Sequence, residues 1–331
     1  EPQWQHLDGK DVLALAALQL TGQIKFKIQE GTLQLQLPSN NVSSLVGQLA
    51  PCHLAVPKNI GGARKVIVFI HGLEGGASTF SQARQECVKH GIVPLTFDYP
   101  NDGPTQSAAL ALRKQLSEVS RKHPDLRLTI VAHSLGGLVA VLAVCDSQFP
   151  PNLVTDVFTL GTPFRGSALA DFQSEVELST VVWRLIKKDW TAVDIVSDGR
   201  GEAADDIHPD SELLSRVRGH DLPKSTRFHL AAGSRSYLSN EERELLRREL
   251  PREMRRLRVS LTYAQKLERL LKSDEVKDGQ ADGAVTIDSA TALRGSHCKR
   301  IFEATHLELV SSNASDAPKR VFAWILEEMR W

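Results

Sequence analysis

The chain has 331 residues, of which 41% are hydrophobic, and its 40 basic side chains balance 40 acidic ones. This size allows one large α/β core or two modest domains, and we interpret the chain as one main domain with additions. A formal net charge of zero provides no global positive field, so we expect no nucleic-acid partner, and any charged function must be local.

The cysteines are scattered and form no C-x-x-C pair; they are Cys52, Cys87, Cys145 and Cys298. This spacing argues against a zinc site and against a disulfide scaffold, although one bridge remains open. We therefore expect no metal and no cofactor.

No apolar run reaches the roughly 18 residues that a membrane-spanning helix needs, so we expect a soluble chain as given. The chain begins at Glu1 rather than at methionine. The sequence is therefore compatible with the mature form of an exported or membrane-anchored protein, and it does not decide the compartment.

Residues 1–60 include the stretch "QIKFKIQEGTLQLQL", in which polar and apolar side chains alternate around Gly31. Such alternation predicts a β-hairpin with one buried face. We interpret 1–60 as a β-rich extension without chemistry of its own.

From Lys65 onward the pattern changes to short apolar runs that end in small or polar residues: "KVIVFIHG", "IVPLTFDYP", "RLTIVAHS", "VTDVFTLGTP", "TRFHLAAGS" and "CKRIFEATH". Helical patterns lie between several of them, including 107–123 and 134–146. This alternation predicts an α/β fold, with a mostly parallel sheet and helices on both faces. Ligands of such sheets bind beyond the carboxyl ends of the strands, where the polar residues fall.

One insertion, at about 171–224, interrupts the alternation. Within it Trp183, Ile186, Trp190 and Val193 follow helical spacing and form an apolar stripe. The stripe is compatible with packing on the core and with a helical cap over a site. In the second interpretation Trp183, Ile186 and Trp190 bind substrate.

A second insertion, at about 236–275, opens with a capping box of Ser239 and Glu242, and we expect its helix to break at Pro251. Between Arg243 and Arg258 there are seven arginines and three glutamates. A solvated helix face explains most such runs, whereas a surface for anionic lipid headgroups is the alternative.

The stretch "AHSLGG" places Ser134 between a strand-like run and a helical one. A tight turn there would expose the hydroxyl and aim the next backbone N–H at the same point. The turn needs small neighbours, which Ala132 and Gly136 supply. The alternative is a serine that merely caps a helix.

This stretch resembles the nucleophile elbow of α/β-hydrolases, G-x-S-x-G, in their lipase-like branch, with Ala132 at the first position. "VIVFIHGLEGG" resembles the oxyanion loop of that family, which implies that the backbone N–H groups of Leu73 and Leu135 hold the oxyanion. His71 would then shape the loop.

Three further stretches resemble the same family. "FTLGTPFRGS" is similar to the strand and turn after the elbow helix, with Phe164 where histidine is common. "DGQADGAVTIDSA" and "FEATHLELV" resemble the acid loop and the terminal histidine loop. The resemblance implies that Asp282 orients the base and that His306 is the base, in the chain order expected of the fold.

The rival histidines are rejected on position. His133 is expected to point to the opposite side of the elbow from its neighbour, and His229 lies within a strand pattern. His306 follows the last strand-like run, which leaves it at the carboxyl edge of the sheet.

Among the acids, Asp278 and Asp288 flank Asp282 and remain alternatives. We prefer Asp282 because the following glycine allows a sharp turn that faces a carboxylate inward. Glu303 lies too close to His306 along a strand to reach back.

We therefore expect residues 61–331 to form a serine carboxylic ester hydrolase of the α/β-hydrolase fold that acts on acyl esters or lipids. The cap and the basic helix would make peripheral contact with a membrane surface. The same triad would serve a thioesterase or an acyltransferase, and a non-catalytic relative that binds lipid or a partner is an alternative of a different class.

Overall fold

The computed structural model describes three short strands within residues 1–51 and, beyond them, residues 52–57, 60–63, 65–73, 75–100, 103–171, 205–257, 261–312 and 314–329. The chain divides into two compact units, 1–51 and 52–331. We expected the boundary after residue 60. Within the described residues, no helix has the length and apolar character that crossing a membrane requires.

The first unit contains a three-stranded antiparallel sheet in the order β1-β3-β2. Its strands are β1 (Trp4–Gln5), β2 (Lys25–Gln29) and β3 (Thr32–Gln36). The predicted hairpin is confirmed, because Phe26 pairs with Leu35 and Ile28 with Leu33. The alternating apolar residues thus meet across the ladder.

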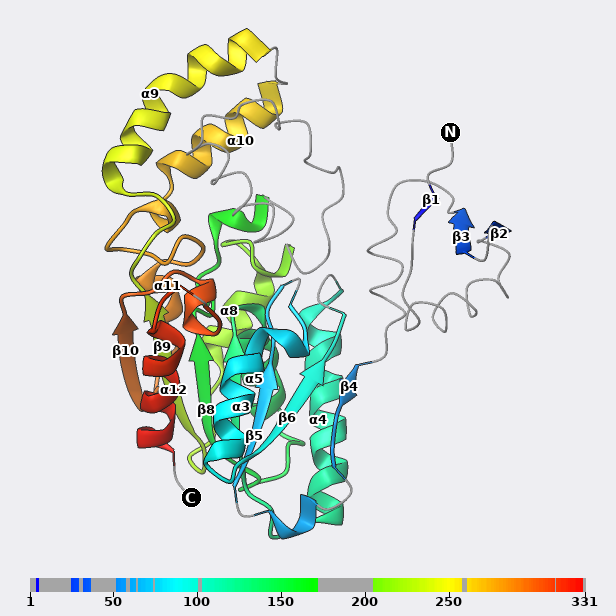
Figure 1. Cartoon of the computed structure of the whole chain (residues 1–331). Coiled ribbons are helices and arrows are strands. Elements are labelled where there is room, and N and C mark those ends of the chain that lie inside the picture. Colours follow the sequence, from blue (N-terminus) through cyan, green and yellow to red (C-terminus); the bar gives the residue numbers. More distant parts are fainter. Residues whose placement is uncertain are drawn as a thin grey trace. The chain divides into compact units, whose positions relative to one another are not determined.

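The second unit is built on a seven-stranded sheet in the order β10-β9-β8-β7-β5-β6-β4, shown in Figure 1. All neighbours are parallel except β4 and β6. The strands are β4 (His53–Leu54), β5 (Val66–Ile70), β6 (Val93–Asp98), β7 (Leu128–His133), β8 (Val154–Leu160), β9 (Arg227–Gly233) and β10 (Cys298–Phe302). The six predicted strands are all present, and the mostly parallel sheet confirms the predicted fold class.

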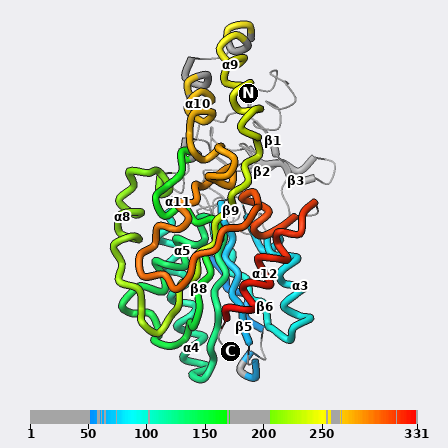
Figure 2. Tube along the Cα trace, turned by 90° about the vertical axis from the view of Figure 1, so that its left-hand side faces the viewer, coloured from blue at the N-terminus to red at the C-terminus, as the bar shows by residue number. Residues whose placement is uncertain are grey.

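Helices cover both faces of this sheet (Figures 1 and 2). One face packs against α4 (Thr105–Lys122), α5 (Leu135–Val144) and α8 (Glu212–Gly219). The other packs against α3 (Ser81–Lys89) and α12 (Ala317–Glu328). A four-residue helix, α11 (Ile287–Ala290), precedes β10.

The apolar run of β5 shows why the central strands lack alternation. Val66, Val68 and Ile70 join the core on one face, and Ile67 and Phe69 join the core on the other. A strand covered on both sides must be apolar at every position. Helix α5 is likewise buried along its whole length, which fixes the segment that follows β7.

Helix α8 falls within the expected cap insertion at 171–224. It nevertheless packs on the core, where Leu213, Leu214 and Val217 are buried. This part of the insertion therefore belongs to the body of the second unit. Trp183, Ile186, Trp190 and Val193 lie outside the described residues.

The second insertion forms α9 (Asn240–Leu257) and α10 (Leu261–Lys272), which pack on each other and project beyond the carboxyl ends of the strands (Figure 1). The predicted capping box is confirmed, since the Ser239 amide donates to Glu242 at 2.8 Å and the Glu242 amide donates to the Ser239 hydroxyl at 3.2 Å. The predicted break at Pro251 is wrong, because α9 continues through it. Burial of Leu246 and Leu250 offsets the one helix hydrogen bond that proline removes.

Candidate active site

Ser134 occupies a sharp turn between β7 and α5. Its φ of 51° and ψ of −125° lie where few residues with a side chain are found, and its amide donates to the Leu160 carbonyl at 2.9 Å. Gly136 makes this turn possible, because a Cβ there would lie 2.3 Å from the carbonyl oxygen of His71. Ala132, fully buried, is the small residue on the strand side.

The loop after β5 lies against this turn. A Cβ on Gly72 would come within 2.7 Å of the Ser134 Cβ. Leu73 follows Gly72 and packs partly buried against the core, while Leu135 is buried as the first residue of α5. The Leu135 amide, like every N–H in the first turn of a helix, has no acceptor inside its helix.

His71 holds that loop in shape, as expected. Its Nδ1 donates to the Gly72 carbonyl at 2.9 Å, the Tyr99 hydroxyl donates to the His71 carbonyl at 2.8 Å, and the two rings stack with centroids 4.5 Å apart. Burial lowers the pKa of His71, against the opposing effects of the Gly72 contact and of Asp98. The Tyr99 amide also donates to His71 Nε2 at 3.4 Å, and an imidazole that accepts this bond must be neutral.

Asp282 and His306 form a buried pair. Asp282 Oδ2 lies 2.7 Å from His306 Nδ1, and both side chains are fully buried. The other carboxylate oxygen, Oδ1, accepts from the amides of Ala284 at 3.0 Å and Val285 at 2.7 Å. Donation from Nδ1–H to a carboxylate fixes the tautomer in which Nε2 has the lone pair, as a general base needs.

Ser134 and His306 lie on adjoining segments. Gly161 directly follows Leu160, the acceptor of the Ser134 amide, and a Cβ on Gly161 would lie 2.8 Å from His306 Cε1 and 3.1 Å from Asp282 Oδ2. Gly161 adopts a φ of +61°. Because Gly161 has no side chain, the His306 imidazole can approach the edge of the sheet beside the turn at Ser134.

His133 lies against His306. Its Nε2 donates to the His306 carbonyl at 3.1 Å, and the two rings are 4.5 Å apart, on the same side as the predicted base. His133 is therefore a neighbour of His306, and the described partner of Asp282 is His306.

The rival acids contact other groups. Asp278 accepts from the Ser236 amide at 3.0 Å, and Asp288 forms an exposed ion pair with Arg165 at 2.6 Å. Glu303 is exposed. Of the four acids considered from the sequence, the structure brings Asp282 to His306.

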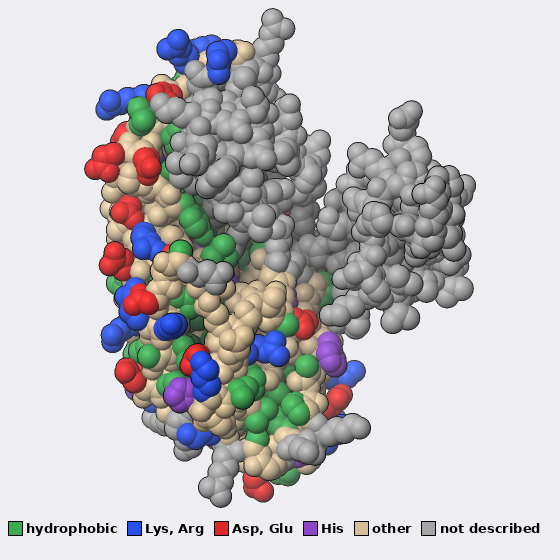
Figure 3. All heavy atoms as spheres, viewed as in Figure 1, with side chains coloured by type: hydrophobic (Ala, Val, Ile, Leu, Met, Phe, Trp, Pro, Cys, Tyr) green, Lys and Arg blue, Asp and Glu red, His purple; other side chains and the backbone are tan. Residues whose placement is uncertain are grey.

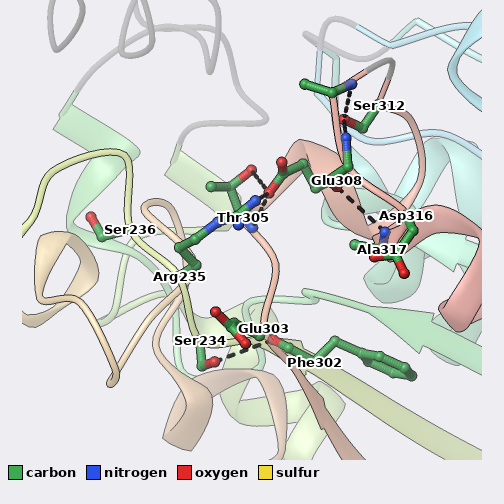
Figure 4. Close-up of polar contacts among 12 residues, drawn as sticks. Ser234, Arg235, Ser236, Phe302, Glu303, Thr305, Glu308, Ser312, Asp316 and Ala317 are labelled. Carbon is green, nitrogen blue, oxygen red and sulfur yellow. Dashed lines mark hydrogen bonds and ion pairs between the residues drawn. The ribbon is translucent and has the colours of Figure 1, made fainter.

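Sequence reasoning missed the residue that holds the histidine loop. Glu308 accepts from the Thr305 amide at 2.9 Å and from the Thr305 hydroxyl at 3.0 Å, and it pairs with Arg235 (Figure 4). Burial would raise the pKa of Glu308, but these hydrogen bonds outweigh it and lower the pKa. The spacing of threonine and glutamate in "THLE" is a capping-box signal that could have found it.

These features together define a site of the α/β-hydrolase class: a strained serine between strand and helix, and a buried acid and histidine on the loops after later strands. The chain belongs to the alpha/beta hydrolase family, whose model matches residues 67–316.

Two lipases are similar to parts of the sequence. Triacylglycerol lipase 2 of Saccharomyces cerevisiae is 29% identical over 86 residues, 25% of this chain and 26% of that protein. A triacylglycerol lipase of Burkholderia plantarii is 27% identical over 153 residues, 42% of this chain and 40% of that protein. The chain thus aligns with less than half the length of either relative.

Solved structures share the fold at low identity. The mature form of the Bacillus licheniformis lipase BlEst2 has a TM-score of 0.53 and 21% identity, over 83% of this chain and 98% of that one. Phospholipase PlaB of Legionella pneumophila has a TM-score of 0.52 and 12% identity, over 79% and 59%. These likenesses show that the second unit has the fold of the family whose model it matches.

Proposed function

We propose that this protein hydrolyses carboxylic esters through a triad of Ser134, His306 and Asp282. The observation that supports it most is the buried Asp282–His306 pair beside a serine at a strained elbow. A serine hydroxyl is a weak nucleophile until a base takes its proton. The tautomer that Asp282 imposes supplies such a base.

In the proposed reaction His306 Nε2 takes the hydroxyl proton of Ser134 as Oγ bonds to the ester carbonyl carbon. The tetrahedral intermediate collapses, the alkoxide leaves with the proton from Nε2, and an acyl-serine remains. Water then attacks the acyl-serine, with His306 again taking and returning the proton, which releases the acid. Asp282 stays ionised and stabilises the imidazolium.

The backbone N–H groups of Leu73 and Leu135 are the proposed oxyanion donors. The contact of the Gly72 segment with Ser134 supports the first, and the place of Leu135 at the start of α5 supports the second. A helix N-terminus also favours negative charge. Loss of one such donor costs about 2.7 to 4 kcal/mol of transition-state stabilisation in comparable sites.

Acyl lipids are the proposed substrate class. Two relatives are named triacylglycerol lipases. In addition, α9 exposes Arg247, Arg248, Arg252, Arg255 and Arg256 beyond the carboxyl ends of the strands, the edge where Ser134 lies; Figure 3 shows basic side chains gathered there. Exposed arginines attract anionic headgroups. Peripheral contact with a lipid surface through α9 is therefore part of the proposal.

The test is an ester panel. Initial rates on p-nitrophenyl esters from acetyl to palmitoyl would be compared for the wild type, Ser134→Ala and a control, Ser117→Ala. Ser117 lies on α4 and donates to the Arg113 carbonyl within that helix. Hydrolysis that only Ser134→Ala abolishes supports the proposal, and hydrolysis that survives in Ser134→Ala contradicts it.

Adding acyl thioesters and an alcohol acceptor to the panel separates the alternatives. A thioesterase would turn over acyl thioesters faster than matched oxyesters, and an acyltransferase would form a new ester when an alcohol is added. A non-catalytic relative would give no turnover of any member of the panel.

A further inference from the structure

A second group of buried polar side chains lies where β9, β10 and α12 meet. His229, in the interior of β9, is fully buried, and Cys298 is its register partner on β10. Their side chains face each other, with Sγ 3.5 Å from Nδ1. Glu328, in the last turn of α12, places Oε2 4.0 Å from the same nitrogen. The three donor atoms all lie within 4.8 Å of one another.

This group is separate from the triad. Cys298 begins β10, whereas the triad residues follow the carboxyl ends of their strands. Figure 1 shows the end of α12 near the amino ends of the strands, at the opposite edge of the sheet from α9 and α10. The mechanism proposed above uses none of these side chains.

The contacts of His229 leave Nδ1 as the nitrogen with the lone pair. Its Nε2 lies 2.9 Å from Asp156 Oδ1, and Asp156 is fully buried. A carboxylate only accepts, so Nε2 has the proton. Histidines that bind metals usually donate their second N–H to a carboxylate in this way.

The spacing suits a tetrahedral ion. Bonds of about 2.05 Å to nitrogen and 2.3 Å to sulfur put those two atoms about 3.6 Å apart, and they are 3.5 Å apart here. Glu328 must approach by somewhat under 1 Å, since nitrogen and oxygen ligands of one ion lie about 3.3 Å apart. Its side chain is 34% exposed, which gives it that freedom and gives an ion a path from solvent.

The charges also balance. Arg227 pairs with Asp156 at 2.6 Å, so these two cancel. The Cys298 thiolate and the Glu328 carboxylate then match the two positive charges of the ion. Burial and the neighbouring Glu328 raise the pKa of the Cys298 thiol, against the opposing effects of Arg300 and Arg227, so the thiolate forms only when the ion displaces the thiol proton.

We propose that His229 Nδ1, Cys298 Sγ and a Glu328 oxygen bind one divalent transition-metal ion of the zinc class, with water as the fourth ligand. Binding replaces the thiol proton, which is released to solvent, and it changes no oxidation state. The ion links the C-terminal helix to two strands, so its role is structural. The sequence argument against zinc relied on short C-x-x-C spacing, whereas these ligands are distant in the chain.

The test uses the full chain, with Zn²⁺ and Co²⁺ as probes. Zinc affinity is measured by competition with a chromophoric chelator, and Co²⁺ loading is followed for thiolate-to-cobalt charge-transfer absorption. The variants are Cys298→Ser and Glu328→Gln. Matched controls are Cys52→Ser and Glu327→Gln, which alters the exposed neighbour of Glu328 on α12.

We expect one zinc per chain in the wild type and in both controls, with a rise in Tm on loading. Cys298→Ser should lose the charge-transfer band, and each ligand variant should bind zinc on the order of 10- to 100-fold more weakly, by analogy with the losses seen when metal-site partners are removed. Unchanged zinc affinity in Cys298→Ser, no bound zinc in the wild type, or Co²⁺ loading without the thiolate band would each overturn the proposal.

Discussion

Asp282 and His306 are joined twice. The carboxylate Oδ2 lies 2.7 Å from the imidazole Nδ1, and the His306 amide donates to the Asp282 carbonyl at 2.9 Å. The backbone hydrogen bond holds the loop of Asp282 and the loop of His306 at a fixed distance. The two side chains are therefore already placed for their own hydrogen bond. Preorganisation of this kind is what a general base requires.

Removing the charge of Asp282 should therefore disable catalysis without unfolding the protein. Asp282→Asn keeps the shape but favours the wrong imidazole tautomer, and we expect kcat to fall on the order of 10³- to 10⁴-fold. Asp278→Asn and Asp288→Asn, which alter acids bonded elsewhere, should retain kcat within a few-fold. Steady-state kinetics on one soluble ester check this, and a larger loss in either control than in Asp282→Asn would refute the assignment.

Gly161 offers a test of the space around the base. Gly161→Ala introduces a Cβ 2.8 Å from His306 Cε1 at a φ of +61°, so kcat should fall sharply as the imidazole shifts. Gly91→Ala is the matched control, because Gly91 has a φ of +66° and no atom within 4 Å of the new Cβ. It should show only the cost of a positive φ, about 1 to 2 kcal/mol of unfolding free energy, with kcat unchanged. Equal kcat in the two variants would mean that Gly161 does not shape the site.

From the contacts of Glu308 we predict a specific pH dependence of the protein's free energy of unfolding. Its pKa is lower in the folded chain than the ordinary value of about 4.3. It therefore stabilises the fold above that pH, and this contribution is lost as pH falls through the folded-state pKa.

Denaturant unfolding at a series of pH values tests this prediction. Glu308→Gln should be less stable than the wild type near pH 7. The difference should shrink as the pH falls below about 4.3, the ordinary pKa of this carboxyl group in the unfolded chain, and through the lower pKa of the folded chain. Glu303→Gln, an exposed neighbour, should follow the wild type throughout. A gap between Glu308→Gln and the wild type that stays constant with pH would contradict the ionic role of Glu308.

Trp183 and Trp190 provide a test of the helical cap, which is predicted from the sequence alone. If the apolar stripe lines an acyl pocket, replacing Trp183 and Trp190 by glutamine should weaken turnover of long acyl esters more than that of acetyl esters, since each fully buried apolar side chain contributes about 1.5 to 3 kcal/mol. The ratio of kcat/KM between palmitoyl and acetyl esters is the measurement. A uniform loss, or one that follows lower stability, would favour ordinary core packing.

The sheet was predictable because strands buried on both faces must be apolar throughout, and this gives runs as clear as 66–70. Strand β4 could not be predicted, because a strand of two residues is too short to show an alternating pattern. Pro251 misled the prediction of α9, since burial of leucines on that helix outweighs the loss of one backbone bond. The local sequence pattern thus predicted the positions of the strands and helices well and their ends less well.

The site divides in the same way. The turn at Ser134 and the pairing of Asp282 with His306 could be predicted because each residue lies in a local motif whose residue order is characteristic. The position of His133 and the group around His229 could not, because they depend on contacts between segments far apart in the chain. Such contacts follow from strand order and register, which the sequence alone did not supply.

The most direct test of the account is covalent labelling of the folded protein with a fluorophosphonate, followed by peptide mass spectrometry. The account predicts one modified residue, Ser134, with labelling abolished in Ser134→Ala and greatly slowed in His306→Ala and Asp282→Asn. Modification of a different serine, or no modification of folded protein, would contradict the claim that Ser134 is an activated nucleophile.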